Sequence, residues 1–170
     1  MLRPDSAVAS IPCGLMSEVL LATSEPFSDV HLYAIDNDSK NFDLIQEKYG
    51  ERLVGNDFHK VPKNALDIDY EKEHKERFDV ICSIGFTIYL PNDDDVQKLF
   101  NGFYIALKKN GMLVTNFAAE QKKYTNVEDL KIQNPTYRLV SGFLILHDKC
   151  YNTLFFEYCD LIQYLFCVVL

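Results

Sequence analysis

The chain has 170 residues, a formal net charge of −8 from 17 Lys+Arg and 25 Asp+Glu, and a composition that is 48% apolar and 13% aromatic. These values fit one globular domain over residues 1–170 and exclude disordered, collagen-like and disulfide-scaffold classes. The acidic balance argues against a nucleic-acid partner, because phosphate contacts need a concentrated positive surface. We therefore expect a small or neutral partner molecule.

The five cysteines form no CxxC pair, and several lie inside apolar runs. This usage is typical of reduced thiols in the core of a cytoplasmic protein. The first ten residues lack the basic and apolar stretches of a signal peptide. The apolar segment Leu154–Leu170 is interrupted by Glu157, Asp160 and Gln163, so we expect a buried terminal element there and no membrane span.

Short apolar runs alternate with helical patterns in the first part of the chain, which is typical of βαβ units and a mostly parallel sheet. The predicted elements are, in chain order, a strand at 7–11, a helix with its pattern running from Met16 to Thr23, a strand at 30–35, a helix from Phe42 to Gly50, and a strand at 58–61. The fold class that these elements favour is α/β, a Rossmann-like three-layer αβα sandwich.

The second half begins with the run Phe78–Ser83, which is nearly all apolar and predicts a strand buried on both faces. A helix should open near Asn92 and close at Lys108, Lys109 and Gly111, with apolar positions that include Tyr104 and Leu107. A strand at 112–117 follows. Residues 118–134 are polar and predict a loop or lid, whereas the pattern of 137–146 and 154–170 does not separate helix from strand.

Ligands of an open parallel sheet bind beyond the carboxyl ends of its strands. Gly14 follows the first predicted strand and leaves room for a ligand near the backbone, and Asp36 ends the second strand, where its carboxylate can accept hydrogen bonds from ribose hydroxyls. These positions imply an adenosine-type ligand. The stretch from Pro12 to Ser17 holds one glycine, which disfavours a dinucleotide site, and no P-loop motif occurs.

Five segments, in this order and spacing, resemble the motifs of class I S-adenosylmethionine-dependent methyltransferases: Ala7–Gly14, Val30–Asn37, Asn64–Leu66, Phe78–Pro91 and Leu107–Phe117. The resemblance implies S-adenosylmethionine as cofactor. It assigns the methionine moiety to the first turn, the ribose to the end of the second strand, the adenine to the two asparagines, and the transferable methyl to the end of the fourth strand. The cofactor-binding residues implied are Ile11, Pro12, Cys13, Gly14, Asp36, Asn37, Asn64, Ala65, Ser83 and Gly85.

The sequence departs from this family at two positions. Ser10 stands where an acidic residue is usual, and Met16 stands where a further glycine is usual. The chain also starts almost on its first strand, so either it is truncated or its pocket is unusually open. Two functions therefore stay open: methyl transfer to a small-molecule acceptor, and a degenerate fold that serves as a non-catalytic binding or interaction module. A third function, NAD-dependent oxidation, is disfavoured because the first turn has one glycine where a dinucleotide site needs several.

No catalytic residue follows from the pattern, because methyl transfer from a sulfonium mainly needs positioning and exclusion of water. His147 and Tyr89 are candidate bases on residue type alone. Cys13 is interpreted as a packed turn residue in preference to a nucleophile. The acceptor should not be a nucleic-acid base, since the motif of amino-group methylating enzymes is missing after the fourth predicted strand.

No metal site is predicted. The three aspartates 93–95 are interpreted as the acidic start of a helix, and His31, His59 and His74 have no zinc-like spacing. The apolar end Leu165–Leu170 is left open as a core strand, a dimer contact or the end of a truncated piece, so a homodimer remains among the alternatives.

Overall fold

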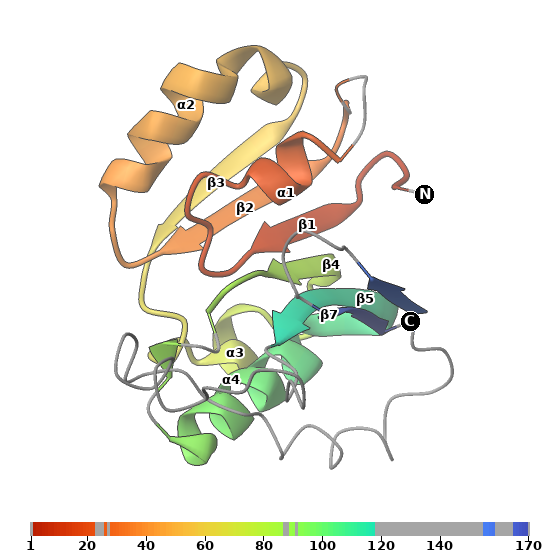
Figure 1. The fold of residues 1–170 in the computed structure, drawn as a ribbon. Helices are drawn as coiled ribbons and strands as arrows, with labels where there is room; N and C mark the ends of the chain where they lie inside the picture. Colours follow the sequence, from red (N-terminus) through yellow and green to blue (C-terminus); the bar gives the residue numbers. More distant parts are fainter. Residues whose placement is uncertain are drawn as a thin grey trace.

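The computed structural model describes residues 2–22, 26, 28–86, 89–90, 92–117, 155–158 and 165–169. These residues form a seven-stranded sheet in the order β3-β2-β1-β4-β5-β7-β6 (Figure 1). The first five strands are parallel to one another, and β7 runs antiparallel to both β5 and β6. The strands are β1 Ala7–Ser10, β2 His31–Asp36, β3 Asp57–Pro62, β4 Phe78–Ser83, β5 Leu107–Phe117, β6 Phe155–Tyr158 and β7 Leu165–Val169.

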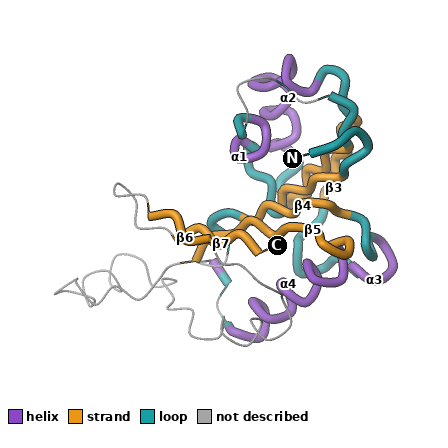
Figure 2. Tube along the Cα trace, turned by 90° about the vertical axis from the view of Figure 1, so that its right-hand side faces the viewer, coloured by secondary structure: helices purple, strands orange, loops and turns teal. Residues whose placement is uncertain are grey.

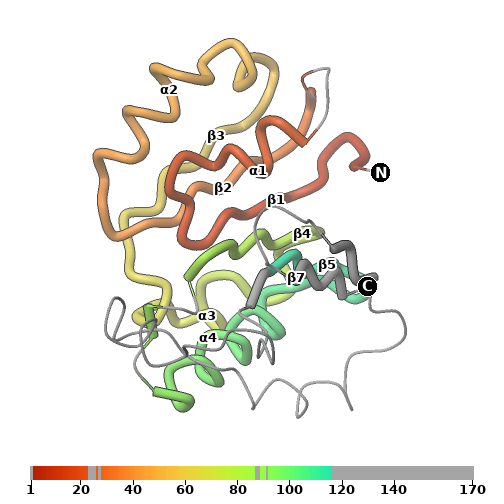
Figure 3. The backbone as a smooth tube through the Cα atoms, viewed as in Figure 1, coloured from red at the N-terminus to blue at the C-terminus, as the bar shows by residue number. Residues whose placement is uncertain are grey.

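Helices cover both faces of the sheet, which confirms the predicted Rossmann-like three-layer α/β fold (Figure 2). Alternate residues of β1 and β2 point to opposite faces, as the period of a strand requires. Val8 and Leu32 pack with α1 (Ser17–Leu20) and α2 (Lys40–Leu53). Ala9 and Tyr33 pack with α3 (Tyr70–Glu73) and α4 (Asp93–Ala106). The strand β1 therefore lies between two apolar cores and beside both β2 and β4 (Figure 3).

The first helix is shorter than its sequence pattern predicts. Met16, which precedes α1, has a left-handed backbone with φ 55°, and Leu21 leaves helical geometry at the other end with φ −107°. A single turn is enough to bury Val19 and Leu20, while Leu21 is 52% exposed. The prediction of a helix that runs to Thr23 is therefore wrong.

The second helix is longer than predicted. It passes Gly50 and ends at Leu53, with one non-helical residue at Tyr49. The glycine that terminates it is Gly55, which adopts φ +79° just beyond the C-cap, the conformation that favours glycine after a helix. The prediction that the helix stops at Gly50 is therefore wrong, because α2 continues past this residue.

The strand β4 has the predicted bounds. Asp79, the charged residue in its apolar run, accepts hydrogen bonds from the Ala7 amide and from Lys108 Nζ, each at 2.7 Å. This carboxylate therefore ties β4 to the chain on both sides, which explains how the strand carries a charge.

The end of α4 and the start of β5 correct the prediction. The helix stops at Ala106 and the strand begins at Leu107, five residues before the predicted start. Asn110 has a left-handed φ of 65°, and a Cβ at Gly111 would lie 2.9 Å from the Lys108 carbonyl oxygen. These residues therefore make an irregular strand pairing with β4 and not a helix end. Tyr104, predicted on the buried face of α4, is 59% exposed.

The apolar C-terminal segment contains the strands β6 and β7, which resolves the ambiguity between helix and strand there. No helix in the part of the chain that the structure describes is long and apolar enough to cross a membrane. The polar segment 118–134, predicted as a loop or lid, and the apolar run 137–146 lie outside the described residues, as does His147.

Candidate functional site

The turn after β1 lies against the end of β2, so the two positions singled out in the sequence meet. The Gly14 amide donates a hydrogen bond of 3.0 Å to Asp36 Oδ2, and the Cys13 amide donates one of 2.8 Å to the Ile35 carbonyl. Gly14 has φ +46°, and a Cβ there would have no neighbour within 4 Å. The glycine therefore provides the left-handed turn and leaves open space at the carboxyl edge of the sheet.

The Asp36 carboxylate already accepts hydrogen bonds from the protein. Its Oδ2 receives the Gly14 amide and a long contact of 3.8 Å from the Cys13 thiol, and its Oδ1 receives the Asp38 amide at 2.9 Å. An ionised carboxylate offers about four acceptor sites, so two strong amide donors leave room for two hydroxyl donors. Asp36 is, however, only 6% exposed, so a ligand has little access to its carboxylate.

A cavity of about 160 Å³ lies at the ends of the strands. Four predicted cofactor-binding residues line it, together with Lys63, Leu66, Phe86 and Leu90; the four are Pro12, Asn37, Asn64 and Ala65. Drug-sized ligands occupy pockets of roughly 300–1,000 Å³, so this cavity is small for a nucleoside ligand. A larger hollow of about 420 Å³ lies away from the strand ends, between α3 and α4, and shares Ala65 and Leu66 with the smaller one.

The loop after β3 that borders both cavities is held by local hydrogen bonds. Asn64 Oδ1 accepts from the Leu66 amide at 3.0 Å, as in an Asx turn, and the Tyr70 hydroxyl donates to the Ala65 carbonyl at 3.1 Å. These two bonds fix the backbone of the loop on the side where the resemblance implies the adenine.

The remaining candidate residues differ in burial and in whether a ligand could reach them. Ile11 is fully buried and packs in the core between the sheet and α4, so its side chain is not available to a ligand. Ser83 ends β4 with its Oγ buried and without a hydrogen-bond partner among the described residues. Gly85 has φ +76° and open space at its Cβ position. Tyr89, a candidate base, is 66% exposed.

Glu18 is a residue that the sequence analysis missed. Ser10 Oγ donates a hydrogen bond to Glu18 Oε1, although the two residues belong to β1 and α1. A carboxylate from the following helix thus lies beside Ser10, one of the two positions at which the sequence departs from the methyltransferase motifs. Only the fold of the turn brings this carboxylate back to β1, so no local pattern could have indicated it.

Burial favours the protonated form of the two thiols Cys13 and Cys82. Burial, followed by the charge of Asp36 and its hydrogen bond, raises the pKa of Cys13 far above the ordinary thiol value. Burial, together with the charge of Glu18, raises the pKa of Cys82 to about 12. Both cysteines are free and buried, as expected of core thiols.

Known proteins resemble this chain in structure, whereas no protein family matches its sequence. No family model matches the sequence, and no curated protein matches it. Among solved structures, a possible exported protein from Bordetella parapertussis superposes with a TM-score of 0.79 and 26% identity, over 99% of this chain and 62% of that one. A candidate O-methyltransferase from Nostoc punctiforme follows, with a TM-score of 0.73 and 11% identity, over 98% and 51%.

A third similar structure is the geranyl diphosphate C-methyltransferase of Streptomyces coelicolor, solved with Mg²⁺, geranyl diphosphate and S-adenosyl-L-homocysteine. It superposes with a TM-score of 0.66 and 14% identity, over 98% of this chain and 72% of that one. The chain therefore has the fold of class I S-adenosylmethionine-dependent methyltransferases, as the sequence resemblance implied. It spans less than two thirds of the length of the first two structures.

Proposed function

We propose that the chain binds S-adenosylmethionine at the carboxyl ends of β1 to β4 and transfers its methyl group to a small-molecule acceptor. The observation that carries this proposal is the hydrogen bond between the Gly14 amide and Asp36 Oδ2, because it brings the open turn and the acidic strand end together in a class I fold. The bound cofactor would supply an electrophilic methyl group on a sulfonium.

The residues present fit such a cofactor. Asp36 keeps about two acceptor sites, which matches the two hydroxyls of a ribose. Asn37, Asn64 and Ala65 would border the adenine, since all three line the same cavity. Ser83 Oγ is a buried polar group that lacks a hydrogen-bond partner among the described residues, and such groups are rare unless a ligand or water satisfies them.

The role of the protein in this chemistry would be to position the acceptor and exclude water. The turn from Pro12 to Gly14 would face the methionine moiety, and Ser83 and Gly85 would border the acceptor. No described residue stands out as a general base. The net charge of −8 favours a small acceptor over a nucleic acid, and a cytoplasmic location stays a prediction.

One alternative has an observation in its favour. Asp36 is nearly buried and already bonded to two backbone amides, and the adjoining cavity of about 160 Å³ is small. These are the features expected if the carboxylate now only stabilises the turn. A degenerate fold that serves as a non-catalytic binding or interaction module is therefore the second candidate.

Calorimetric titration with S-adenosylmethionine and S-adenosylhomocysteine separates the two candidates. We expect saturable binding, and we expect Asp36→Asn to weaken it at least about tenfold, since a charged hydrogen bond contributes roughly 1.5–3 kcal/mol. Asp43→Asn, which removes an exposed carboxylate on α2, is the matched control and should bind like the unmodified chain. Absence of heat and of any thermal shift at millimolar ligand would refute cofactor binding and favour the interaction module.

A further inference from the structure

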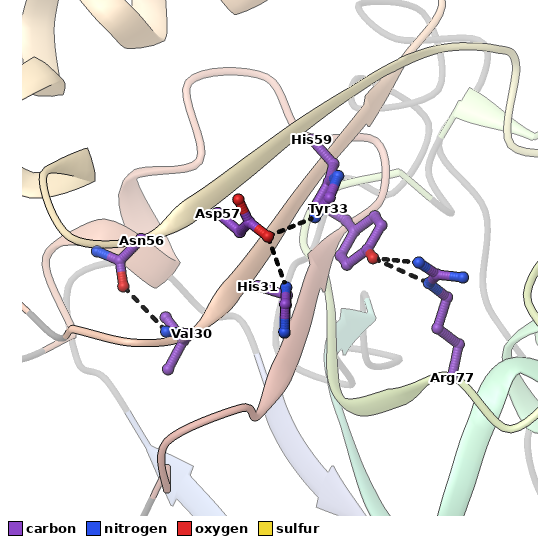
Figure 4. Close-up of polar contacts among 7 residues, drawn as sticks. All are labelled: Val30, His31, Tyr33, Asn56, Asp57, His59 and Arg77. Atoms are coloured by element: carbon purple, nitrogen blue, oxygen red, sulfur yellow. Dashed lines mark hydrogen bonds and ion pairs between the residues drawn. The ribbon is translucent and has the colours of Figure 1, made fainter.

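Three side chains with metal-binding atoms meet at the start of β2 and β3: His31, Asp57 and His59 (Figure 4). His31 opens β2 and pairs in register with Asp57, which opens β3, and His59 lies two residues further along β3 beside Tyr33. Because residues two apart on a strand point to the same face, the register places all three on one face of the sheet. The sequence showed no zinc-like spacing, since the ligand atoms come together only through strand pairing.

The separations of the ligand atoms match a single bound ion. His31 Nδ1 lies 3.2 Å from Asp57 Oδ2, and His59 Nε2 lies 3.9 Å from the same oxygen. All three atoms lie within 4.8 Å of one another. Two ligands at about 2.0–2.1 Å from a tetrahedral zinc ion are roughly 3.3 Å apart, so small side-chain rotations would close the site.

The ring of His59 is held in place by its neighbours. The Tyr33 ring stacks on it with centroids 4.2 Å apart and an angle of 14°, and Arg77 Nε donates a hydrogen bond of 3.0 Å to the Tyr33 hydroxyl. His59 Nε2 faces Asp57 and is buried, yet it has no hydrogen-bond partner among the described residues. The stacking thus positions the His59 ring so that Nε2 faces the Asp57 carboxylate, as two ligands of one ion would.

We propose that His31, Asp57 and His59 bind one divalent transition-metal ion, for which zinc is the best match. Two imidazoles and a carboxylate are ligands that zinc accepts in tetrahedral sites, and the three side chains are 37–69% exposed, which leaves a position for water. The ion would connect β3, which lies at one end of the described sheet, to β2.

This site is separate from the proposed cofactor site. His31 begins β2 and Asp36 ends it, so the two residues are roughly 16 Å apart at about 3.3 Å per strand residue. An ion at His31 therefore cannot touch a methyl group transferred at the carboxyl edge of the sheet. The test of this site does not depend on whether the chain binds S-adenosylmethionine.

Titration of the tag-free, metal-stripped chain with zinc chloride, and with cobalt(II) followed by visible absorption, tests the proposal. We expect one equivalent to bind, and we expect His31→Gln, Asp57→Asn and His59→Gln each to weaken binding at least about tenfold, since even the loss of an outer hydrogen-bond partner of a metal ligand costs about 10- to 100-fold. Asp43→Asn, which removes an exposed carboxylate outside the cluster, is the matched control and should bind like the unmodified chain.

Thermal unfolding provides an independent measurement. Zinc should raise the melting temperature of the unmodified chain but not that of His59→Gln, because an ion that binds only the folded state stabilises it. Absence of saturable binding to the unmodified chain, or binding that all three cluster variants retain, would overturn the proposal. A thiolate-to-cobalt charge-transfer band would also overturn it, since that band assigns the metal to cysteines.

Discussion

Replacement of Gly102 by alanine should destabilise the protein, because a side chain at this position of α4 would meet the Tyr70 ring of α3. A Cβ there would lie 2.5 Å from Tyr70 Cε2, closer still to Cδ2, and 3.2 Å from Cγ. The Tyr70 ring has little freedom to retreat, since it is buried, packs edge-on against Phe103, and donates its hydroxyl to the Ala65 carbonyl. The added methyl group must therefore displace a ring that is fixed at both ends.

The expected cost follows from opposing contributions. Overpacking in a well-packed core costs about 1–3 kcal/mol, and loss of the Tyr70–Ala65 hydrogen bond adds about 1 kcal/mol. Alanine in place of glycine within a helix returns about 0.5–1 kcal/mol. The net loss should be about 1–3 kcal/mol, which lowers the melting temperature by roughly 3–10 °C in a chain of this size.

Urea and thermal unfolding measure this difference, with Gly50→Ala as the matched control. Gly50 also lies within a helix, α2, but a Cβ there meets nothing within 4 Å. The control should therefore be stabilised by about 0.5–1 kcal/mol. If Gly102→Ala were as stable as the unmodified chain, or were stabilised like the control, the inferred packing of α4 on Tyr70 would be wrong.

Three further predictions concern single groups. Burial lowers the pKa of His74 below its ordinary value near 6.5, so the unfolded state binds the proton more readily than the folded state. The free energy of unfolding should therefore fall as the pH drops below about 6.5. His74→Phe should flatten this pH dependence between pH 7.5 and 5.5, and an unchanged slope would contradict the burial argument. Gly111→Ala should lower the free energy of unfolding, measured in urea, by about 1–3 kcal/mol. Its Cβ would lie 2.9 Å from the Lys108 carbonyl oxygen and 3.0 Å from the Phe78 carbonyl oxygen. An unchanged free energy of unfolding would contradict this close approach of the backbone. Cys13 should resist iodoacetamide in the folded protein at pH 7.5, as followed by peptide mass spectrometry, because burial raises its thiol pKa; rapid alkylation under native conditions would refute this.

The interior of the sheet could be predicted from the sequence, whereas the ends of its elements could not. The run Phe78–Ser83 predicts a strand with correct bounds because burial on both faces requires continuous apolar residues. Gly50 and Gly111 were both interpreted as helix stops, yet one lies within α2 and the other within β5. A glycine signals conformational freedom, and only the surrounding backbone determines how that freedom is used.

Part of the candidate site could likewise be predicted from the sequence, and part could not. Position at the strand ends was sufficient to predict that Gly14 and Asp36 meet, because parallel strands bring their carboxyl ends to one edge. The hydrogen bond from Ser10 to Glu18 depends on how sharply the turn after β1 folds back, which no residue type encodes. The cluster of His31 with Asp57 depends on the register of two strands that lie far apart in sequence.

A crystal structure of the chain with S-adenosylhomocysteine would show whether Asp36 holds the ribose of the cofactor. We expect both ribose hydroxyls to lie within about 3 Å of the Asp36 carboxylate oxygens, while Gly14 keeps its backbone hydrogen bond to the same side chain. A nucleoside bound elsewhere on the molecule, or crystals soaked at millimolar ligand that show none at this edge of the sheet, would contradict it.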